Sequence, residues 1–600
     1  MRARRTLSVT VSVCFAASLL AACGSGGSST TNNGGTQETD NAERGGTLNI
    51  LGTSDVDYMD PNVSYYSLGY LNLRMWSRQL FSYPSEEGHV TESAPDLATE
   101  IPTKDNGGIS DDAMTYTIHI RDGVMWNSSP ARAVVAQDIV RGIERTCNPY
   151  QPFGGIPDFA TLIKGYQGFC DGFAKVDPTA KAMADYIRGN EISGVKAVDD
   201  TTLKFTLNSP ATYFVDMLAM PAFSAAPEEW LDYRPASSEL ADHLLSDGAY
   251  QVESWNPTKE IVYTRNPAWD PDTDPLHAAY VDKIVVDQTV AQDSIQQRLE
   301  TGTDAADMTF GDGPPQSQLP RLMSSGDDNL VIGETSSTNP YVVFNMVSPN
   351  NGKALQDVQV RQALEQAMNR DDLIQVLGGP KLNNPLTHVL PESILGSQDI
   401  SPYDFDPDQA KATLAKAGYA KGLTLKFLYR PSSDASKKAF QTVQQNLSDI
   451  GVKVEGVESP DADFYTKYLQ VPDVAKRGVW DLALSGWGSD WFGDAALSYF
   501  KPLFYGKAAF PPIGSNFGFY ESAATNKLID QAASASTEDE SSKLWAEADQ
   551  AVMDDAPFFP ITNPKDARYH AAQVHNTIYM PTYQSFDPTN VWLESGHQGG

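Results

Sequence analysis

The chain has 600 residues, with 44 lysines and arginines against 77 aspartates and glutamates, which gives a formal net charge of -33 at pH 7. A chain this acidic argues against a nucleic-acid partner and against a polybasic membrane patch. Its length exceeds the usual domain size of about 100 to 200 residues, so at least two lobes are expected.

The start of the chain has the pattern of a lipoprotein signal peptide. A basic start is followed by an apolar stretch over 7–20 and by Leu-Ala-Ala-Cys, which ends at Cys23. Residues 1–22 are therefore predicted to be removed, and Cys23 to carry two or three acyl chains that anchor the protein stably. The alternative is an ordinary secretory signal with an incidental cysteine. An arginine pair at positions 4 and 5 leaves both general and twin-arginine export open.

The segment after Cys23 is rich in Ser, Thr, Asn and Gly. It contains few apolar groups to bury, so residues 23–46 are predicted to form a flexible tether, with order beginning near Thr47. No later stretch holds about 18 uninterrupted apolar residues, so the lipid alone is expected to hold the mature body at the membrane.

Two cysteines remain in the mature body. Cys14 is lost with the signal and Cys23 takes the lipid, which leaves Cys147 and Cys170. In an oxidising exterior such a pair is most simply a disulfide closing a local loop. Free thiols or a metal site are the alternatives, but no Cys-x-x-Cys or cluster of histidines accompanies the pair.

The first half of the chain shows strand signals. Residues 115–120 alternate between polar and apolar side chains and stop at Arg-Asp-Gly, which predicts a strand and a turn. Residues 194–198 and 202–207, joined by Asp199 and Asp200, predict a hairpin.

The second half changes to a helical rhythm. Asp357 and Asp406 are predicted to cap two helices, and Gly418 to end the second one. A strand over 423–429, a helix ending near Gly451 and a strand over 452–457 follow. This order is a β-α-β unit, so the second lobe is predicted to be α/β with a mainly parallel sheet.

Short motifs in a fixed order resemble those of a known family. They include Met59-Asp60-Pro61, Ala94-Pro95-Asp96-Leu97-Ala98, Ala136-Gln137-Asp138-Ile139-Val140, Arg265-Asn266-Pro267-Ala268-Trp269, Val360-Arg361-Gln362-Ala363-Leu364, Trp480-Asp481-Leu482-Ala483 and Ala556-Pro557-Phe558-Phe559-Pro560. Together they resemble the peptide-, nickel- and oligopeptide-binding class of solute-binding proteins that serve ABC importers. Residues 125–130 depart from the family pattern, and residues 148–188 look like an insertion.

The resemblance implies an α/β, two-lobed, periplasmic-binding-protein-like clamp with an extra subdomain inserted in the first lobe. Ligands of such proteins sit between the lobes, which close by hinge motion. The expected parts are the first lobe over 47–80, 191–330 and 556–600, the inserted subdomain over 81–190, and the second lobe over 331–555.

The strongest candidate binding residue is Asp490. It follows an apolar strand from Leu482, at a place where α/β sheets commonly contact ligands. The resemblance implies that its carboxylate pairs with the α-ammonium of a peptide, a charge-assisted bond of about 1.5 to 3 kcal/mol. The alternatives are a loop or helix-capping carboxylate without a ligand, or Asp494 in the same role.

Further candidates are weighed against packing roles. Trp487 and Trp491 could wall the cleft or fill the core. The strand containing Tyr341 and Asn345 resembles the one by which the family enters its second lobe, where a peptide can pair with backbone groups; Asn345 is equally plausible as a structural hydrogen-bonder. Tyr65 and Tyr66, after Asp60-Pro61, complete the candidates.

The function that the resemblance implies is capture of di- or oligopeptides and delivery to an ABC permease, at the outer face of the membrane and as a monomer. No cofactor or metal is expected. Binding of nickel, of a metal chelate or of another small solute is the alternative within the same fold. An extracellular hydrolase is disfavoured because Gly-x-Ser-x-Gly, His-Glu-x-x-His and a phosphate loop are all missing from the sequence.

Overall fold

The computed structural model describes residues 34–302, 305–333, 338–431, 433–460, 463–512 and 514–595, all within one compact unit. The predicted signal peptide and Cys23 lie outside the described residues. Over these ranges no helix combines the length and the apolar character needed to cross a membrane.

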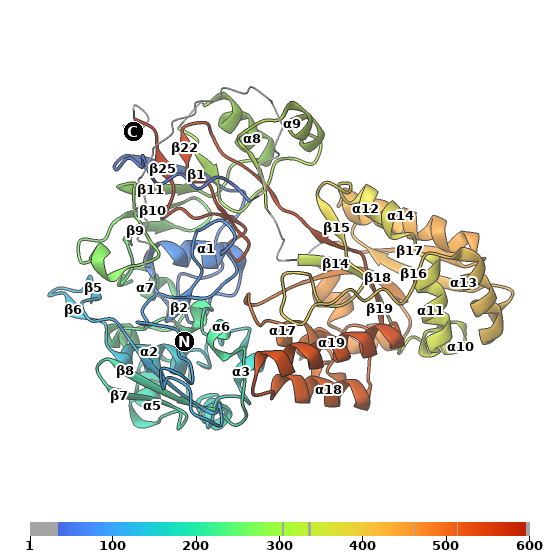
Figure 1. The fold of residues 1–600 in the computed structure, drawn as a ribbon, viewed down its shortest axis with the longest axis horizontal. Coiled ribbons are helices and arrows are strands. Elements are labelled where there is room, and N and C mark those ends of the chain that lie inside the picture. Colours follow the sequence, from blue (N-terminus) through green and yellow to red (C-terminus); the bar gives the residue numbers. More distant parts are fainter. Residues whose placement is uncertain are drawn as a thin grey trace, which may run out of the picture. The chain divides into compact units, whose positions relative to one another are not determined.

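The first lobe contains a mixed five-stranded sheet (Figure 1). In spatial order its strands are β12 (Met308–Thr309), β1 (Thr47–Leu51), β11 (Lys283–Asp287), β10 (Glu260–Arg265) and β9 (Tyr250–Asn256). β1 runs parallel to both of its neighbours, and β10 runs antiparallel to both of its neighbours. Leu48 and Ile50 of β1 are buried in the same apolar core as helix α1 (Ser67–Trp76).

The inserted subdomain is a three-stranded sheet with helices. Its elements are β4 (Thr115–His119), β7 (Val195–Asp199), β8 (Thr202–Thr206), α2 (Ala136–Arg145), α4 (Tyr166–Phe173) and α5 (Ala180–Gly189). The predicted strand and the predicted hairpin are both confirmed. Because β8 pairs along β4, the sheet of the subdomain extends to Thr206, past the boundary expected at residue 190.

The second lobe holds the other five-stranded sheet. In spatial order its strands are β17 (Lys453–Glu458), β16 (Thr424–Tyr429), β18 (Leu482–Gly488), β14 (Thr338–Phe344) and β19 (Phe558–Pro560). The predicted β-α-β unit is confirmed, with α14 (Asp434–Asp449) between β16 and β17. The expectation of a mainly parallel sheet holds for β17, β16, β18 and β19, which run in one direction, whereas β14 is reversed and pairs antiparallel with β18 and with β19.

Helix caps of the second lobe follow the sequence prediction. The side chain of Asp357 accepts from a backbone N–H in the first turn of α11 (Val358–Ala367), and Asp406 does the same for α13 (Pro407–Leu414). Beyond α13 a π-helical turn continues to Tyr419, and Gly418 within it has φ 96°. Glycine adopts this left-handed region without steric cost, which explains why the helix ends there.

Both faces of the second-lobe sheet are covered by helices. Along β18, Leu482 and Leu484 are buried in one apolar cluster together with residues of α11 and α14. Ala483, between them, belongs to the other large cluster, which contains residues of α17 (Leu497–Phe504) and α19 (Glu538–Asp555). This alternation is the period of two that a strand imposes on its side chains.

The chain passes between the lobes along paired strands. β13 (Leu330–Ile332) precedes β14 and pairs antiparallel with β21 (Ala567–Tyr569), while β19 pairs with β14. Since β19 still belongs to the second-lobe sheet, the return to the first lobe lies beyond Pro560 and not at residue 556, where the sequence places it.

Part of the predicted tether is held by specific contacts. Gly34 N–H donates to the carbonyl of Ile332 at 2.7 Å, and Gly45 N–H donates to that of Tyr280 at 2.9 Å. Glu38 lies 2.7 Å from the ring of His575. Residues 34–46 are therefore bound to the first lobe along their length, in contrast to the flexible segment that composition suggests.

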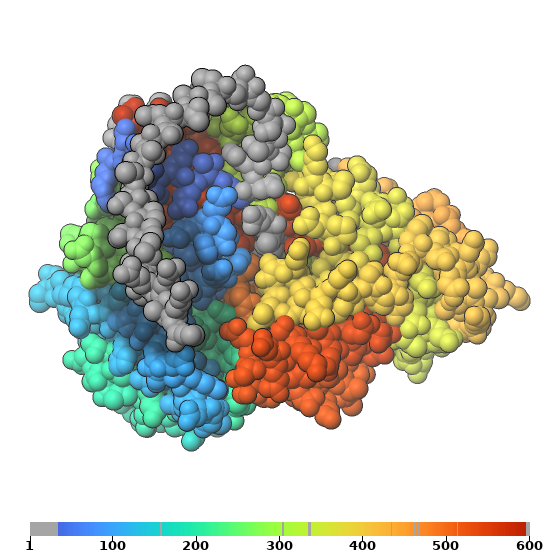
Figure 2. All heavy atoms as spheres, viewed as in Figure 1, coloured from blue at the N-terminus to red at the C-terminus, as the bar shows by residue number. Residues whose placement is uncertain are grey.

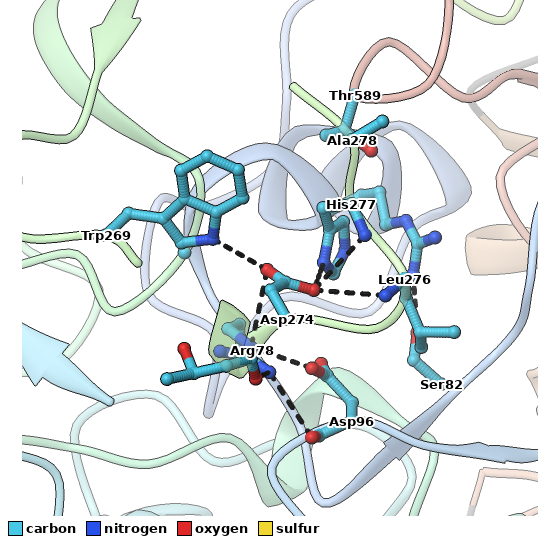
Figure 3. Close-up of polar contacts among 12 residues, drawn as sticks. Arg78, Ser82, Asp96, Trp269, Asp274, Leu276, His277, Ala278 and Thr589 are labelled. Atoms are coloured by element: carbon cyan, nitrogen blue, oxygen red, sulfur yellow. Dashed lines mark hydrogen bonds and ion pairs between the residues drawn. The ribbon is translucent and has the colours of Figure 1, made fainter. Parts of the chain in front are cut away.

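A buried charge network joins two loops of the first lobe (Figure 3). Arg78 Nε donates to Asp96 at 2.7 Å and lies 3.7 Å from Asp274 Oδ2. Burial alone would raise the pKa of Asp274, but His277 and Arg78 beside it lower the pKa below its usual range. Each buried carboxylate is thereby paired, which offsets the cost of removing it from water.

Replacing Arg78 with Met is expected to destabilise the protein by about 3 to 5 kcal/mol, because Asp96 loses its guanidinium partner and Asp274 loses one of the groups that lower its pKa. Urea unfolding followed by tryptophan fluorescence measures the change. The control is Arg188→Met, which breaks an ion pair with Glu228 whose two side chains are both 48% exposed; its cost should stay below about 1 kcal/mol. Equal losses for the two variants would contradict the role of the network.

Candidate functional site

A cavity of about 790 Å³ lies where the two lobes meet, and residues of both line it. The first lobe contributes Tyr65, Tyr213 and several residues of the inserted subdomain between positions 154 and 167. The second lobe contributes the end of β18, part of α17 and one face of α18 (Ala523–Ala533). Sites for small molecules commonly measure about 300 to 1,000 Å³, so the cavity has the size of a ligand site.

Asp490 lines this cavity in the loop after β18 and is partly buried. Tyr65, which precedes α1 in the first lobe, donates its hydroxyl to Asp490 Oδ1 at 2.6 Å. A hydrogen bond to an ionised carboxylate is about twice as strong as a neutral one. A carboxylate at the wall of a cavity is the complementary group for a cationic part of a ligand.

The two predicted tryptophans have different surroundings. Trp487 is partly buried, lines the cavity, and donates its indole N–H to the carbonyl of Ser498 at 2.8 Å. Trp491 is 1% exposed and stacks on Tyr213 with a ring separation of 6.2 Å. The geometry therefore places Trp487 at the candidate site and Trp491 in the core behind it.

The remaining candidates lie away from the cavity. Asn345 is fully buried and donates to the carbonyls of Ala475 and Trp480, which is the structural alternative considered for it. Tyr341 packs edge-on against Phe558 in the core. Tyr66 is 69% exposed at the start of α1, so only Tyr65 of the tyrosine pair reaches Asp490.

Asp494, the alternative to Asp490, lies in a different environment. It is 5% exposed, accepts a hydrogen bond from Thr212 at 2.5 Å, and donates its backbone N–H to Asp216 at 2.8 Å. Burial raises its pKa to about 7. These contacts join the second lobe to the inserted subdomain, where the two parts lie side by side (Figure 2). The structure thus gives Asp494 a contact between lobes and leaves Asp490 at the cavity.

Several lining residues had no local signal in the sequence. Lys501 of α17 lines the cavity, as do Tyr505 and Asp530, which are joined by a 2.6 Å hydrogen bond. These residues lie in or next to helices α17 and α18, which come later in the chain than β18 and Asp490. Only the packing of α17 and α18 against the subdomain shows that they share a surface.

One group of described residues has three potential metal ligands close together: Asp96, Asp274 and His277. Figure 3 shows Arg78 pointing into this group. A guanidinium already supplies the positive charge that a metal ion would bring, so these residues do not fit a metal site.

Two lobes joined by neighbouring strands, with a cavity lined from both sides, define a bilobal binding protein. Residues 92–509 match the family described as bacterial extracellular solute-binding proteins, family 5 Middle, and the chain belongs to this family. The resemblance drawn from the sequence motifs and the expected two-lobed fold are both confirmed.

Known relatives and solved structures agree with this assignment. Glutathione-binding protein GsiB from Escherichia coli O6:K15:H31 is 24% identical over 486 residues, which cover 80% of this chain and 84% of that protein. Clavulanic acid biosynthesis oligopeptide binding protein 2 has a TM-score of 0.82 and 22% identity, covering 94% of this chain and 100% of that one. The periplasmic binding protein DppA from Helicobacter pylori, in complex with peptide STSA, has a TM-score of 0.66 and 24% identity, with 92% and 99% covered.

Replacing Asp494 with Asn is expected to stabilise the protein at about pH 8 and to change little at about pH 4. Its pKa is about 7 in the folded protein, whereas an unfolded aspartate has about 3.9. Between these values the folded state binds more protons than the unfolded state, so the contribution of this carboxyl to stability falls as pH rises. Each pKa unit corresponds to about 1.4 kcal/mol, so the difference can reach a few kcal/mol.

Thermal midpoints of variant and wild type across this pH range measure the effect. Asp111→Asn, at an exposed aspartate of the inserted subdomain, is the control and should follow the wild type throughout. If the Asp494 variant also follows the wild type at every pH, this carboxyl is not the source of the pH dependence.

Proposed function

We propose that this protein is a lipid-anchored extracellular receptor that binds peptides in the cavity between its lobes and delivers them to an ABC permease. The observation that carries the proposal is Asp490, a carboxylate at the wall of a cavity of about 790 Å³ and in contact with Tyr65 of the opposite lobe. A free peptide α-ammonium is the complementary group.

The chemistry of the cavity supports a peptide over a fully charged or fully apolar ligand. Asp490 and Asp530 offer anionic partners and Lys501 a cationic one, while Leu497, Pro502 and Ile529 add apolar surface on the second-lobe side. A charged group in a partly dry site strengthens its hydrogen bonds, and apolar walls accept side chains of varied shape. One fixed ammonium contact beside apolar walls suits binding of peptides and their delivery without chemical change.

The relatives support the same ligand class. One relative carries the name glutathione-binding protein, and glutathione is a peptide with a free amino group; one structural neighbour holds the peptide STSA. The family is one of binding proteins, which favours capture over catalysis. The ABC permease, the monomeric state and the lipid at Cys23 belong to this proposal.

Replacing Asp490 with Asn is expected to weaken binding of trialanine by about 10-fold to 150-fold and to affect N-acetyl-trialanine little. The reason is that a bond to a charged group contributes about 1.5 to 3 kcal/mol, and acetylation removes the ammonium. Isothermal titration calorimetry on the full chain in detergent measures both dissociation constants.

The matched control is Asp530→Asn, another cavity aspartate, whose carboxylate already accepts from Tyr505. An equal loss for both peptides in the Asp490 variant would reject the ammonium contact. Binding of a nickel chelate in place of any peptide would favour the metal alternative, and hydrolysis of a peptide would revive an enzymatic function.

Cys23→Ala is expected to abolish labelling with an alkyne palmitate and to leave a precursor that retains residues 1–22, because the lipid carrier and the cleavage position are both lost. Gel mobility and click labelling of cell membranes measure the two effects. Cys14→Ala, within the predicted signal, should be processed and labelled normally. A normally processed but unlabelled Cys23 variant would instead indicate an ordinary secretory signal.

A further inference from the structure

One wall of the cavity comes from a loop closed by a disulfide. Cys147, just after α2, is bonded to Cys170 in α4, with the two Cα atoms 5.5 Å apart. We call residues 148–169 the disulfide loop. From it Ile156, Ala160 and Leu162 line the cavity, together with the polar residues Thr161 and Gln167.

The disulfide loop also seats the residue that contacts Asp490. A Cβ atom at Gly154 would stand 2.7 Å from the Tyr65 ring, and one at Gly155 would stand 3.3 Å from it. Gly155 has φ -88°, which any residue can adopt, so its small size and not its backbone conformation is what the packing uses. Phe153 then packs edge-on against the Tyr65 ring at 5.0 Å.

These contacts form a continuous physical chain. The bond at Cys147 holds the loop, Gly154 and Phe153 hold the Tyr65 ring, and the Tyr65 hydroxyl donates to Asp490. A cross-link between the ends of a loop limits the conformations available to it. Reduction would therefore release the wall while leaving the rest of the cavity, which other elements supply, in place.

The disulfide loop and the second lobe both contribute apolar side chains to the cavity. Ile156 and Leu162 come from the loop, and Leu497, Pro502 and Ile529 come from the second lobe. An apolar pocket discriminates between ligands by the apolar surface they bury. Asp490 cannot make this distinction, because every free peptide carries the same ammonium.

We infer that the disulfide loop is the specificity-determining wall of the cavity, selecting peptides with apolar side chains, and that the Cys147–Cys170 bond holds it in the selective position. This inference rests on the proposed peptide-binding function. It assigns recognition of the ammonium to Asp490 and recognition of the side chains to the inserted subdomain.

The test measures dissociation constants of trileucine and triglycine by calorimetry on the full chain in detergent. The wild type should bind trileucine more tightly than triglycine. In the double variant Cys147→Ser, Cys170→Ser the ratio of the two dissociation constants should fall by about tenfold. Gly154→Ala keeps the disulfide but displaces Tyr65, so the dissociation constants of both peptides should rise by about tenfold. Gly168→Ala, in the same loop with open space around its Cβ position, is the control and should match the wild type.

A change in the preference between the two peptides distinguishes this role from a purely structural one, because partial unfolding would weaken the binding of both peptides equally. A folded double variant with unchanged preference overturns the inference while peptide binding stands. If the double variant does not fold, unchanged affinities in Gly154→Ala overturn it. If the wild type binds neither peptide, the peptide proposal fails and this inference fails with it.

Discussion

The antiparallel pairing of β14 with β18 and β19 is the constraint on which the rest of the structure depends. The chain enters the second lobe on β14 and leaves it after β19, so both connections to the first lobe lie at neighbouring positions of one sheet. Pairing of Thr338 with Gly488 sets where β18 ends, and Asp490 follows directly in the next loop. A slip of one residue would turn every side chain of β18 to the other face. The register thus ties the candidate site to the connection between the lobes.

Environment separates two carboxylates of one loop. Asp490 is partly buried at a cavity and accepts from a tyrosine of the opposite lobe, whereas Asp494 is enclosed between lobes and its pKa rises to about 7. Near neutral pH a substantial share of Asp494 is therefore protonated. A carboxyl in that state offers a weaker partner to an ammonium, so the geometry and the electrostatics both favour Asp490 as the binding group.

The inserted subdomain has a larger part in the site than its position in the chain indicates. It supplies the disulfide loop to the cavity, and the segment that follows its last strand, β8, contributes Tyr213 and holds Asp494 of the second lobe through Thr212. Binding and contact between the lobes therefore share one surface. A ligand that fills the cavity would contact the subdomain and the second lobe together.

Local signals determined much of this protein from the sequence alone. The caps at Asp357 and Asp406, the hairpin at Asp199 and the β-α-β unit depend on neighbouring residues, and each forms as predicted. Short motifs in a fixed order were sufficient to identify the family. Asp490 could be selected because it follows a strand of recognisable pattern.

Only the tertiary structure decided which distant segments meet. The pairing of β4 with β8 brings residues up to Thr206 into the sheet of the subdomain, and the pairing of β14 makes the second sheet mixed. It also separates Trp487 at the cavity from Trp491 in the core, and brings Tyr65 to Asp490. Contacts of this kind depend on packing between residues hundreds of positions apart, for which the periodicity and capping of single segments contain no information.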